Sequence, residues 1–533
     1  MHWIDAVANT LLRRGVKHVI ASGISISGHI HIGHSNDVFI ADGIRRSIQS
    51  HGGEARALWY ADDFDPMRRV PWPLPPSYAK YLGMPYANIP PPEPGYENFV
   101  DFFAREFLES IDRFGLKLEV YFGSKIYRGG HMAPLIRLAL ERAEEIREIL
   151  NRYRAEPLPE GWLPYNPLCE NCGRIATTKA YGWSGSYVRY RCVGSDYSPG
   201  CGHEGKADYT KGEGKLVWRV EWPARWKLLG VTCEPFGKDH AVVGGSYETG
   251  KLIARRVFDY EAPHPIPYEW VSLSGRQMSS SKGVVFTLSQ WLSIAEPELL
   301  RYFIFRSKAM KAKSFDPGLP LLDLYDEYDI VEEIYFSTRE VGTKKREKVA
   351  RIYELSQVED IPPKKPQRVP FRFAAILIQV VGGKIDRAIK ILERKGFLVQ
   401  PTEHDIELAV RRLSLAQRWV MEYAPERMRF KLLEDIPPKV KESLTEIQRK
   451  ALLQLASDLS ATDYDPVELH NHVYEVARGL GMDPPELFKA IYLVLIGRES
   501  GPRVGNFISA IEKEFVVRRF RDCLLYTSPS PRD

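Results

Sequence analysis

The segment Val16-Lys-His-Val-Ile-Ala-Ser-Gly23 is a short β-branched run that ends in glycine, and Gly23-Ile-Ser-Ile-Ser-Gly-His-Ile-His-Ile-Gly-His34 continues from it. Apolar residues then recur at helical spacing from Ile32 to Ser50, and Ala55–Tyr60 is a second buried-strand pattern. A strand, a glycine-rich turn, a helix and a strand in this order open a parallel α/β sheet. Ligands bind such sheets beyond the carboxyl ends of the strands, so the turn is the expected ligand site.

A proline-rich segment interrupts this first pattern. Proline is dense between Asp65 and Pro94, which predicts a long loop or lid. Helical spacing resumes after it, and four of the six cysteines fall between Cys169 and Cys201. Strand patterns then return, so the sheet is expected to continue after an insertion. These later strands are predicted at Leu216–Trp222, Val231–Phe236 and Pro267–Ser274.

The second half of the chain has a different periodicity. Nearly every segment beyond Asp316 has the apolar spacing of a helix. The predicted fold class is α/β, with a Rossmann-like parallel-sheet catalytic domain, an inserted zinc-bearing segment and an all-α C-terminal half. The expected divisions are a catalytic domain at 1–290 with an inserted region at about 66–215 and a zinc module at 165–206, linker helices at 291–330, and a helical domain at 331–522.

Length and composition exclude several classes of protein. A chain of 533 residues with 44% hydrophobic residues can bury several cores, and a net charge of +5 leaves any nucleic-acid face to local arrangement. The opening residues have no signal-peptide pattern, and the longest apolar run is far shorter than the ~20 residues of a membrane span. We therefore expect a cytoplasmic protein without a membrane partner. The last residues, 523–533, read like a translated cloning adapter and are expected to form a non-native tail.

The glycine-rich turn contains two histidines three residues apart, His31 and His34. In the first turn of a helix they would face an anion bound at the helix N-terminus, with Gly28 and Gly33 allowing a phosphate close to the main chain. Two imidazoles can donate hydrogen bonds to an α-phosphate whose charge grows during in-line displacement. Two histidines at this spacing could instead cap the helix or bind a metal.

A second motif lies about 250 residues further on, Gly275-Arg-Gln-Met-Ser-Ser-Ser-Lys-Gly283. A lysine on a mobile loop, here Lys282, can close over a triphosphate and neutralise charge on a pyrophosphate leaving group. A serine-rich loop with one lysine can also be an ordinary solvated turn. The order of the two motifs makes each of them more specific.

The cysteines form the third motif. Cys169 and Cys172 have the Cys-x-x-Cys spacing of a zinc knuckle, and Cys192 and Cys201 supply a looser second pair. Four thiolates suit a closed, structural tetrahedral Zn²⁺ site, in which His203 could replace either member of the second pair. Cysteines that are merely buried or redox-active are the alternative.

Together the motifs resemble those of class I aminoacyl-tRNA synthetases, and more closely the archaeal-type class I lysyl-tRNA synthetase family. Further segments carry the resemblance over about 1–330, and it continues more weakly to about Phe515. The quoted segments include Tyr60-Ala-Asp-Asp-Phe-Asp-Pro66, Trp218-Arg-Val-Glu-Trp-Pro-Ala-Arg-Trp226, Pro235-Phe-Gly-Lys-Asp-His240, Gly244-Gly-Ser-Tyr-Glu-Thr-Gly250 and Phe315-Asp-Pro-Gly-Leu319.

The resemblance implies ATP- and Mg²⁺-dependent activation of L-lysine to lysyl-adenylate, followed by transfer to the 3′ end of tRNA(Lys). It makes 331–522 an anticodon-binding domain, and it implies that tRNA is needed before lysine is activated. Catalytic roles are implied for His31, His34 and Lys282. The implied ATP contacts are Gly28, His31, Gly33, His34, Met278, Ser279, Ser280, Ser281 and Lys282.

The amino-acid pocket must suit a cation, because a buried ammonium needs a carboxylate or an aromatic face. Three aspartates follow the second predicted strand beside the nucleotide turn, and the resemblance assigns three ring-bearing residues and two residues of the first strand to the pocket. Each of them could equally be a cap or a core residue. The predicted pocket residues are Gly23, Ser25, Asp62, Asp63, Asp65, Trp218, His240 and Tyr268.

Two positions depart from the family pattern. Gln277 stands where the loop usually begins with lysine, so Lys282 must carry more of the phosphate-directed charge, helped by Arg276. His34 stands where this family often has Asn. The competing hypotheses are a class I synthetase for another amino acid, a small-molecule adenylyltransferase with the same turn, and a zinc-bearing RNA-binding protein with a degenerate nucleotide site.

Overall fold

The computed structural model describes residues 1–524, and the chain divides into two compact units. Unit 1 comprises 1–292, 297–315 and 341–361, and unit 2 comprises 293–296, 316–340 and the described residues from 362 onward. This division differs from the predicted boundary at 330, because helix α11 (Leu319–Tyr335) belongs to unit 2 while α12 (Thr343–Ser356) belongs to unit 1. Of the predicted tail, Cys523 is buried in a final turn (Asp522–Leu524), and 525–533 lie outside the described residues.

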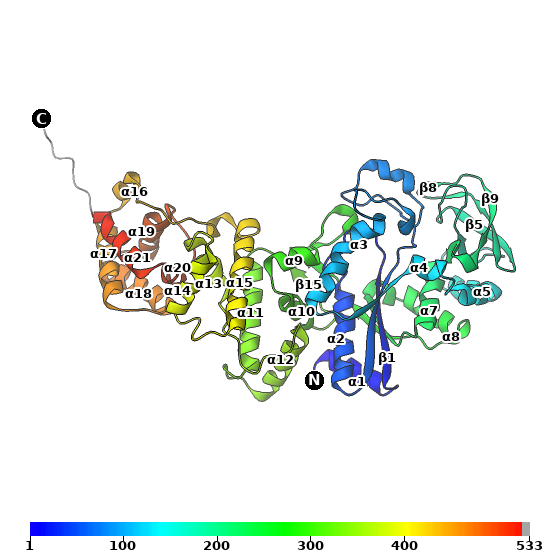
Figure 1. The fold of residues 1–533 in the computed structure, drawn as a ribbon, viewed down its shortest axis with the longest axis horizontal. Helices are drawn as coiled ribbons and strands as arrows, with labels where there is room; N and C mark the ends of the chain where they lie inside the picture. Colours follow the sequence, from blue (N-terminus) through cyan, green and yellow to red (C-terminus); the bar gives the residue numbers. More distant parts are fainter. Residues whose placement is uncertain (525–533) are drawn as a thin grey trace. The chain divides into compact units, whose positions relative to one another are not determined.

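Five parallel strands form the sheet of unit 1, in the order β12–β11–β1–β2–β3 (Figure 1). The chain moves outward from β1 to β2 and β3, and later from β11 to β12 on the other side of β1. The order reverses between β1 and β11, where such sheets bind their ligands. The prediction of a Rossmann-like parallel sheet is therefore confirmed. The strands are β1 Lys17–Ile24, β2 Glu54–Ala61, β3 Leu118–Phe122, β11 Cys233–Gly237 and β12 His264–Tyr268.

Helices cover both faces of this sheet. Helix α2 (Asn36–Ser50) packs on one face, and its residues Phe39, Ile40 and Ile44 are fully buried. Helices α7 (Trp218–Leu229) and α8 (Ser246–Arg256) cover the other face, where Trp222 and Trp226 pack in one apolar cluster with residues of β1, β2 and β11. Burial on both faces explains why β1 and β2 are continuous apolar runs.

The predicted strand at Leu216–Trp222 is wrong. A short strand, β10 (Gly214–Leu216), ends there, and α7 begins at Trp218. The tryptophans at 218, 222 and 226 are four residues apart and stack along one side of the helix, with ring centroids 5.5 and 5.0 Å apart. That spacing fits a helix, and the packing of the rings outweighs the β propensity of single aromatic residues.

The inserted region shares an apolar cluster with α7 and α8 of the sheet domain. Its zinc module contains a three-stranded antiparallel sheet in the order β5–β6–β9, next to the hairpin β7–β8. The proline-rich segment has only two short 3₁₀ turns, as its composition predicts. The elements of the region are 3₁₀ turns Pro76–Tyr81 and Tyr86–Asn88, α3 Phe99–Ser110, α4 Gly123–Arg128, α5 Ala133–Glu141, α6 Ala143–Asn151, β4 Tyr165–Pro167, β5 Thr178–Ser184, β6 Tyr187–Cys192, β7 Gly194–Ser195, β8 Ser198–Pro199 and β9 Glu204–Asp208.

A buried carboxylate joins the sheet layer to the later part of unit 1. Asp42 of α2 is fully buried and pairs with Arg301 of α10 (Pro297–Phe305) at 2.8 Å and with Arg46 at 2.8 Å. Arg301 also donates to the carbonyls of Phe114 and Leu355. The remaining elements here are α1 Trp3–Leu12, β13 Val271–Leu273, β14 Arg276–Gln277, α9 Leu288–Ile294 and β15 Lys313–Phe315.

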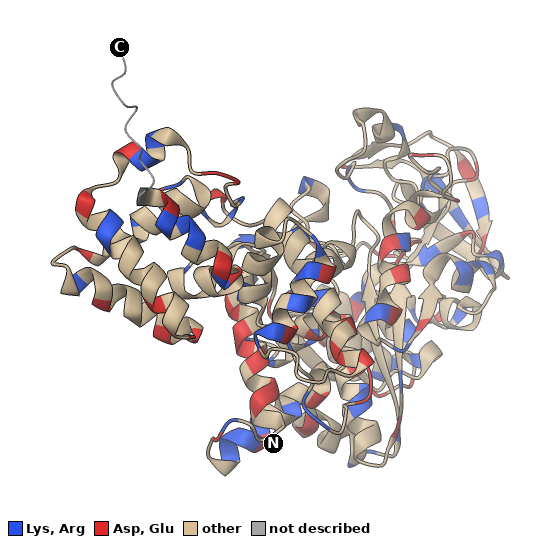
Figure 2. Cartoon of the chain, turned by 60° about the vertical axis from the view of Figure 1, so that its left-hand side comes forward, with Lys and Arg blue, Asp and Glu red and all other residues tan. Residues whose placement is uncertain are grey.

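Unit 2 is helical in its described residues, and its helix α11 is rich in Asp and Glu, whose positions are red in Figure 2. Arg412 of α15 is fully buried and pairs with Asp329 at 2.6 Å and with Glu296 at 2.8 Å, so charge pairing fixes the packing of these segments. The other helices are α13 Phe371–Val380, α14 Ile385–Arg394, α15 Glu403–Glu422, α16 Pro438–Ser443, α17 Glu446–Ala461, α18 Pro466–Gly479, α19 Pro484–Ile496, α20 Val504–Ala510 and α21 Lys513–Arg521.

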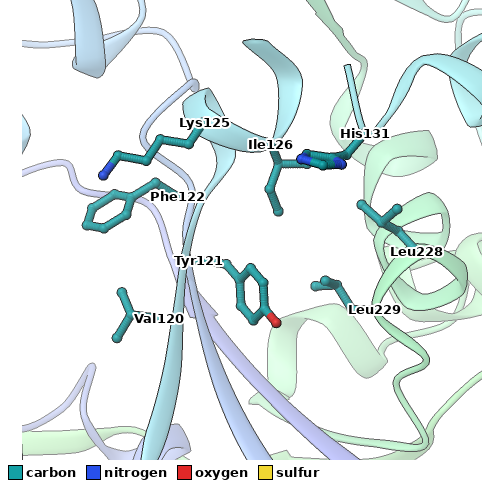
Figure 3. A pocket seen from close by; sticks show the side chains of 8 residues that line it. All are labelled: Val120, Tyr121, Phe122, Lys125, Ile126, His131, Leu228 and Leu229. Carbon is teal, nitrogen blue, oxygen red and sulfur yellow. The ribbon is translucent and has the colours of Figure 1, made fainter. Parts of the chain in front are cut away.

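Two further features complete the fold. Within residues 1–524, no helix has the length and apolar character needed to cross a membrane. A cavity of about 450 Å³ lies beside the edge strand β3, with Tyr121, Ile126, Leu228 and Leu229 among its walls (Figure 3). None of the predicted site residues lines this cavity.

Candidate active site

The glycine-rich turn connects β1 to α2 at the point where the strand order reverses. His31 forms a β-bridge with Thr287, and the amide of Ile32 donates to the carbonyl of Phe286 at 2.9 Å. The segment that follows the serine-rich loop therefore lies directly along the turn. Two motifs about 250 residues apart in the chain meet here.

The two histidines of the turn lie against each other. The rings of His31 and His34 stack with centroids 3.6 Å apart, and the amide of His34 donates to Nδ1 of His31. Burial lowers the pKa of His31 to about 2, with a further contribution from His34, and burial lowers the pKa of His34 to about 4. Both imidazoles are therefore neutral near pH 7.

Polar atoms in this turn are buried without a protein partner. Within the described residues, Nε2 of His31, Nδ1 of His34 and the side-chain amide of Asn36 have no hydrogen-bond partner. A buried polar group that lacks a partner costs free energy, and a cluster of them is typical of a ligand site. Asn36 was not among the predicted residues, although its position at the start of α2 after the second histidine was a usable signal.

The serine-rich loop packs on the turn. Ser280 Oγ donates to the carbonyl of His29 at 2.6 Å. A methyl group added at Gly33 would lie 2.9 Å from Met278 Cε and 3.0 Å from His31 Nδ1, so a side chain there would have to displace the end of Met278 and would crowd the imidazole of His31. Lys282 ends the short turn Ser280–Lys282 with its side chain exposed, and no ion pair holds it within residues 1–524. Its ammonium is thus available to a ligand at this edge of the sheet.

A cavity of about 90 Å³ opens beside the turn, at the carboxyl ends of β1 and β11. Of the predicted pocket residues, Gly23, Asp62, Trp218, His240 and Tyr268 line it, whereas Ser25, Asp63 and Asp65 lie outside its lining. The remaining lining residues were not among the predicted pocket residues. They are Asp37, Trp222, Arg225, Glu234, Pro235, Phe236 and Gly237.

The three predicted aspartates are paired with protein groups. Asp62 accepts from the guanidinium of Arg225 at 2.5 Å, and both side chains are buried. Asp63 accepts from the amide of Ser124 at 2.7 Å and thereby caps α4. Asp65 pairs with the buried Lys215 at 2.5 Å. Their expected role at a substrate ammonium is therefore not supported by these contacts.

Lys215 is the internal cation that makes this network possible. Its ammonium lies 2.6 Å from Glu221 and 2.5 Å from Asp65, and these carboxylates together raise its pKa against the opposing effect of burial. Arg225 stacks on the ring of Tyr60, with 4.1 Å between the guanidinium carbon and the ring centroid. Lys215 and Arg225 thus neutralise the acids with which they pair beside the pocket.

Two other carboxylates in the pocket make no ion pair within residues 1–524, although the positive charge of Arg225 acts to lower the pKa of one of them, Glu234. Asp37 is buried and accepts only from backbone amides, those of Val38 at 2.7 Å and Gly23 at 3.3 Å. Glu234 accepts from the indole nitrogens of Trp222 and Trp226 at 3.0 and 2.5 Å. Burial raises the pKa of Asp37 to about 8 and also raises the pKa of Glu234. This is the part of the pocket that favours a cationic ligand.

The four cysteines converge as their spacing predicts. Their sulfur atoms all lie within 4.8 Å of one another, and the separations Cys169–Cys201 and Cys172–Cys192 are 3.6 and 3.7 Å. Four thiolates around a tetrahedral zinc with Zn–S bonds of about 2.3 Å would be about 3.8 Å apart. His203 instead contacts Glu170 at 2.8 Å and stands outside the cluster. The geometry is compatible with a closed Cys₄ zinc site.

Comparison with known proteins agrees with this geometry. The family model described as tRNA synthetases class I (K) matches residues 1–359, and a model of an anticodon binding domain matches residues 423–524. A lysine–tRNA ligase of Methanosphaera stadtmanae is 42% identical over 98% of this chain and 99% of its own length. Those of Archaeoglobus fulgidus and Methanocaldococcus jannaschii are 40% and 38% identical, each over 98% of this chain and over 100% and 99% of their own lengths.

The chain belongs to the class I (K) tRNA synthetases. The resemblance inferred from the motifs is therefore confirmed. Gln277, where the resemblance predicted lysine, lies exposed in β14 and pairs with Ser272 through the backbone. Arg276 beside it is exposed as well, so two cations of the loop, Arg276 and Lys282, remain free to turn toward a ligand.

The depressed pKa of His34 predicts a dependence of stability on pH. Below its ordinary pKa of 6.5 the unfolded chain binds a proton that the folded protein excludes until about pH 4, so stability is lost as the pH falls through this window. At pH 5 the loss is about 2 kcal/mol. We expect His34→Asn to reduce the difference between the urea unfolding midpoints measured at pH 7.5 and pH 5.0. An unchanged difference would show that His34 is not buried in its neutral form.

Proposed function

We propose that this chain is a lysine–tRNA ligase, which activates L-lysine with ATP and Mg²⁺ and transfers it to the 3′ end of tRNA(Lys). The observation that carries the proposal is the meeting of the histidine turn and the lysine loop beside a pocket with two buried carboxylates that make no ion pair within the described residues. The names of the relatives, which are lysine–tRNA ligases, support the same reaction.

The adenylation step follows from the position of each group. The lysine carboxylate attacks the α-phosphorus of ATP, and pyrophosphate leaves. His31 and His34 are neutral, so each can donate one ring N–H to the phosphate oxygens as their negative charge increases. Lys282 closes from the loop onto the leaving pyrophosphate. We assign ATP contacts to Gly28 and Gly33 of the turn, as the resemblance implies, and to Met278–Ser281 of the loop that packs against these glycines.

The amino-acid pocket favours lysine over the other substrates of class I enzymes. Arg225 lines it and would suit a glutamate side chain, but Asp62 already neutralises its guanidinium at 2.5 Å. Asp37 and Glu234 are buried carboxylates that a substrate ammonium would pair with, and Tyr268 lies near both, since burial, with further contributions from Asp37 and Glu234, raises the pKa of its phenol. We therefore assign the lysine ammonium to the side of the pocket formed by Asp37 and Glu234.

The transfer step requires a tRNA. The match of residues 423–524 to an anticodon binding domain supports tRNA(Lys) as the partner of unit 2. The four cysteines would hold Zn²⁺, which cross-links the inserted module and takes no part in the chemistry.

Aminoacylation with each of the twenty amino acids and total tRNA tests the proposed reaction. We expect only lysine to be charged. His31→Ala should lower the rate of lysyl-adenylate formation by about a hundredfold or more, because it removes one donor to the transition state. Lys282→Ala should lower kcat more than it raises the KM for lysine. Charging of glutamate or arginine instead of lysine would refute the assignment.

The raised pKa of Asp37 predicts how lysine use depends on pH. Below about pH 8 the carboxyl is protonated and cannot pair with the ammonium, so kcat/KM for lysine should fall by up to about tenfold per pH unit. Asp37→Asn should lower kcat/KM by about a hundredfold or more and abolish this dependence, because it removes one partner of a buried pair. Asp63→Asn is the matched control and should leave the KM for lysine near that of the wild type. The reverse pattern would return the ammonium to the predicted aspartates.

The zinc assignment is tested by metal analysis and unfolding. Cys172→Ser should lower the zinc content from one ion per chain and lower the melting temperature of the inserted module, since metal binding supplies part of its folding free energy. His203→Ala should retain the metal, because His203 contacts Glu170 and not the cluster. Full zinc occupancy in Cys172→Ser would contradict the four-thiolate site.

A further inference from the structure

The proline-rich segment 66–94 is attached to the zinc module at its base. The carbonyl of Leu82 accepts from Ser198 Oγ at 2.8 Å and from Arg174 Nε at 3.0 Å. The carbonyl of Gly83 accepts from the amide of Ile175 at 2.8 Å. Figure 1 shows the segment beside strand β8 of the module. These hydrogen bonds attach the segment to the zinc module at Leu82 and Gly83.

Trp72, near the start of the segment, contacts both nucleotide motifs. The ring of Trp72 lies over Gly283, where an added methyl group would be 2.8 Å from the indole Cδ2. The amide of Trp72 faces the carbonyl of Ser281 at 3.5 Å, and its ring is 6.2 Å from the ring of His29. The indole is therefore placed between the loop that carries Lys282 and the turn that carries the two histidines.

Its neighbour Pro71 continues this contact. At Gly28 an added methyl group would lie 3.4 Å from Pro71 Cβ and 2.8 Å from Ser280 Cβ. Pro71 is buried, whereas Trp72 is 51% exposed. Half of the indole surface remains in water, which is unusual for a tryptophan with only a packing role. Its contacts with the loop and the turn, together with this exposure, indicate a role in holding the loop more than in the core.

We propose that Trp72 is a positioning residue, which holds the loop 275–283 against the histidine turn and so places Lys282 at the triphosphate. This role rests on the proposed function. Because Gly283 has no side chain, the indole of Trp72 can pack against the backbone of the loop. The hydrogen bond from Ser280 to the carbonyl of His29 also holds this loop on the turn. Because the base of the segment is attached to the zinc module, folding of that module supports the position of the loop.

Kinetics separate this role from a structural one. We expect Trp72→Ala to lower the rate of lysyl-adenylate formation, measured with tRNA present in a single turnover, by about tenfold or more. The KM for lysine should change by less than about twofold, and Trp72→Phe should restore most of the rate. The matched control is Tyr78→Ala in the same segment, whose hydroxyl donates to Pro90 and not to either motif. Equal losses in both variants, or wild-type rates in Trp72→Ala, would overturn the proposal.

A second measurement does not depend on activity. Trypsin cleaves after Arg276 and Lys282, both of which are exposed in the loop. Release of the loop in Trp72→Ala should raise the initial rate of cleavage there by several-fold at an unchanged melting temperature, and Tyr78→Ala should not. If the wild type failed to charge lysine, the proposed function would fall while this test of the contact remained valid. Unchanged cleavage in Trp72→Ala would show that the indole does not hold the loop.

Discussion

The stacked pair of neutral imidazoles at the start of α2 is the constraint on which the site depends. Burial of His31 and His34 costs free energy, because within the described structure one nitrogen of each ring, Nε2 of His31 and Nδ1 of His34, loses water and gains no protein partner. The cost is acceptable in a site where a ligand supplies the missing partners. The same burial keeps the rings uncharged, so they act as hydrogen-bond donors without repelling Lys282. The glycine at 33 and the loop that packs on it follow from the need to enclose this pair.

Basic side chains pair with some of the acids at the amino-acid pocket and not with others. Lys215 forms ion pairs with Asp65 and Glu221, and Arg225 forms an ion pair with Asp62, so the chain itself neutralises these three acids. Within residues 1–524, Asp37 and Glu234 accept hydrogen bonds only from uncharged donors, and burial raises the pKa of both carboxyls, although Arg225 opposes the rise at Glu234. A ligand with one positive charge would oppose this rise, whereas an anionic one would increase it. The preference for a cationic ligand thus depends on which acids make no ion pair with the chain, and it does not depend on the total number of acids near the site.

The inserted module shows how a distant element can support a catalytic loop. Its four cysteines would hold zinc and so cross-link the module, whose Val188, Tyr190 and Ala207 also pack in an apolar cluster with residues of α5, α6 and α7. The proline-rich segment spans from this module to the nucleotide motifs with little regular structure, and proline limits the conformations it can adopt. Hydrogen bonds at Leu82 therefore attach the segment to the module, and contacts of Trp72 join the segment to the nucleotide motifs.

The sequence alone was sufficient for the features that depend on local pattern or on motif order. The parallel sheet, the helical second half, the family and the convergence of four cysteines follow from periodicity, from Cys-x-x-Cys spacing and from two ordered motifs. It misassigned Leu216–Trp222, where helical packing of tryptophans prevails over strand propensity. It indicated Asp62, Asp63 and Asp65 as pocket residues and did not decide which carboxylate holds the substrate ammonium. Only the tertiary structure shows that Arg225, Ser124 and Lys215 already pair with these aspartates, and that Asp37 and Glu234 make no ion pair within residues 1–524. The physical reason is that pairing of buried charges is set by contacts between residues far apart in the chain, which no local pattern encodes.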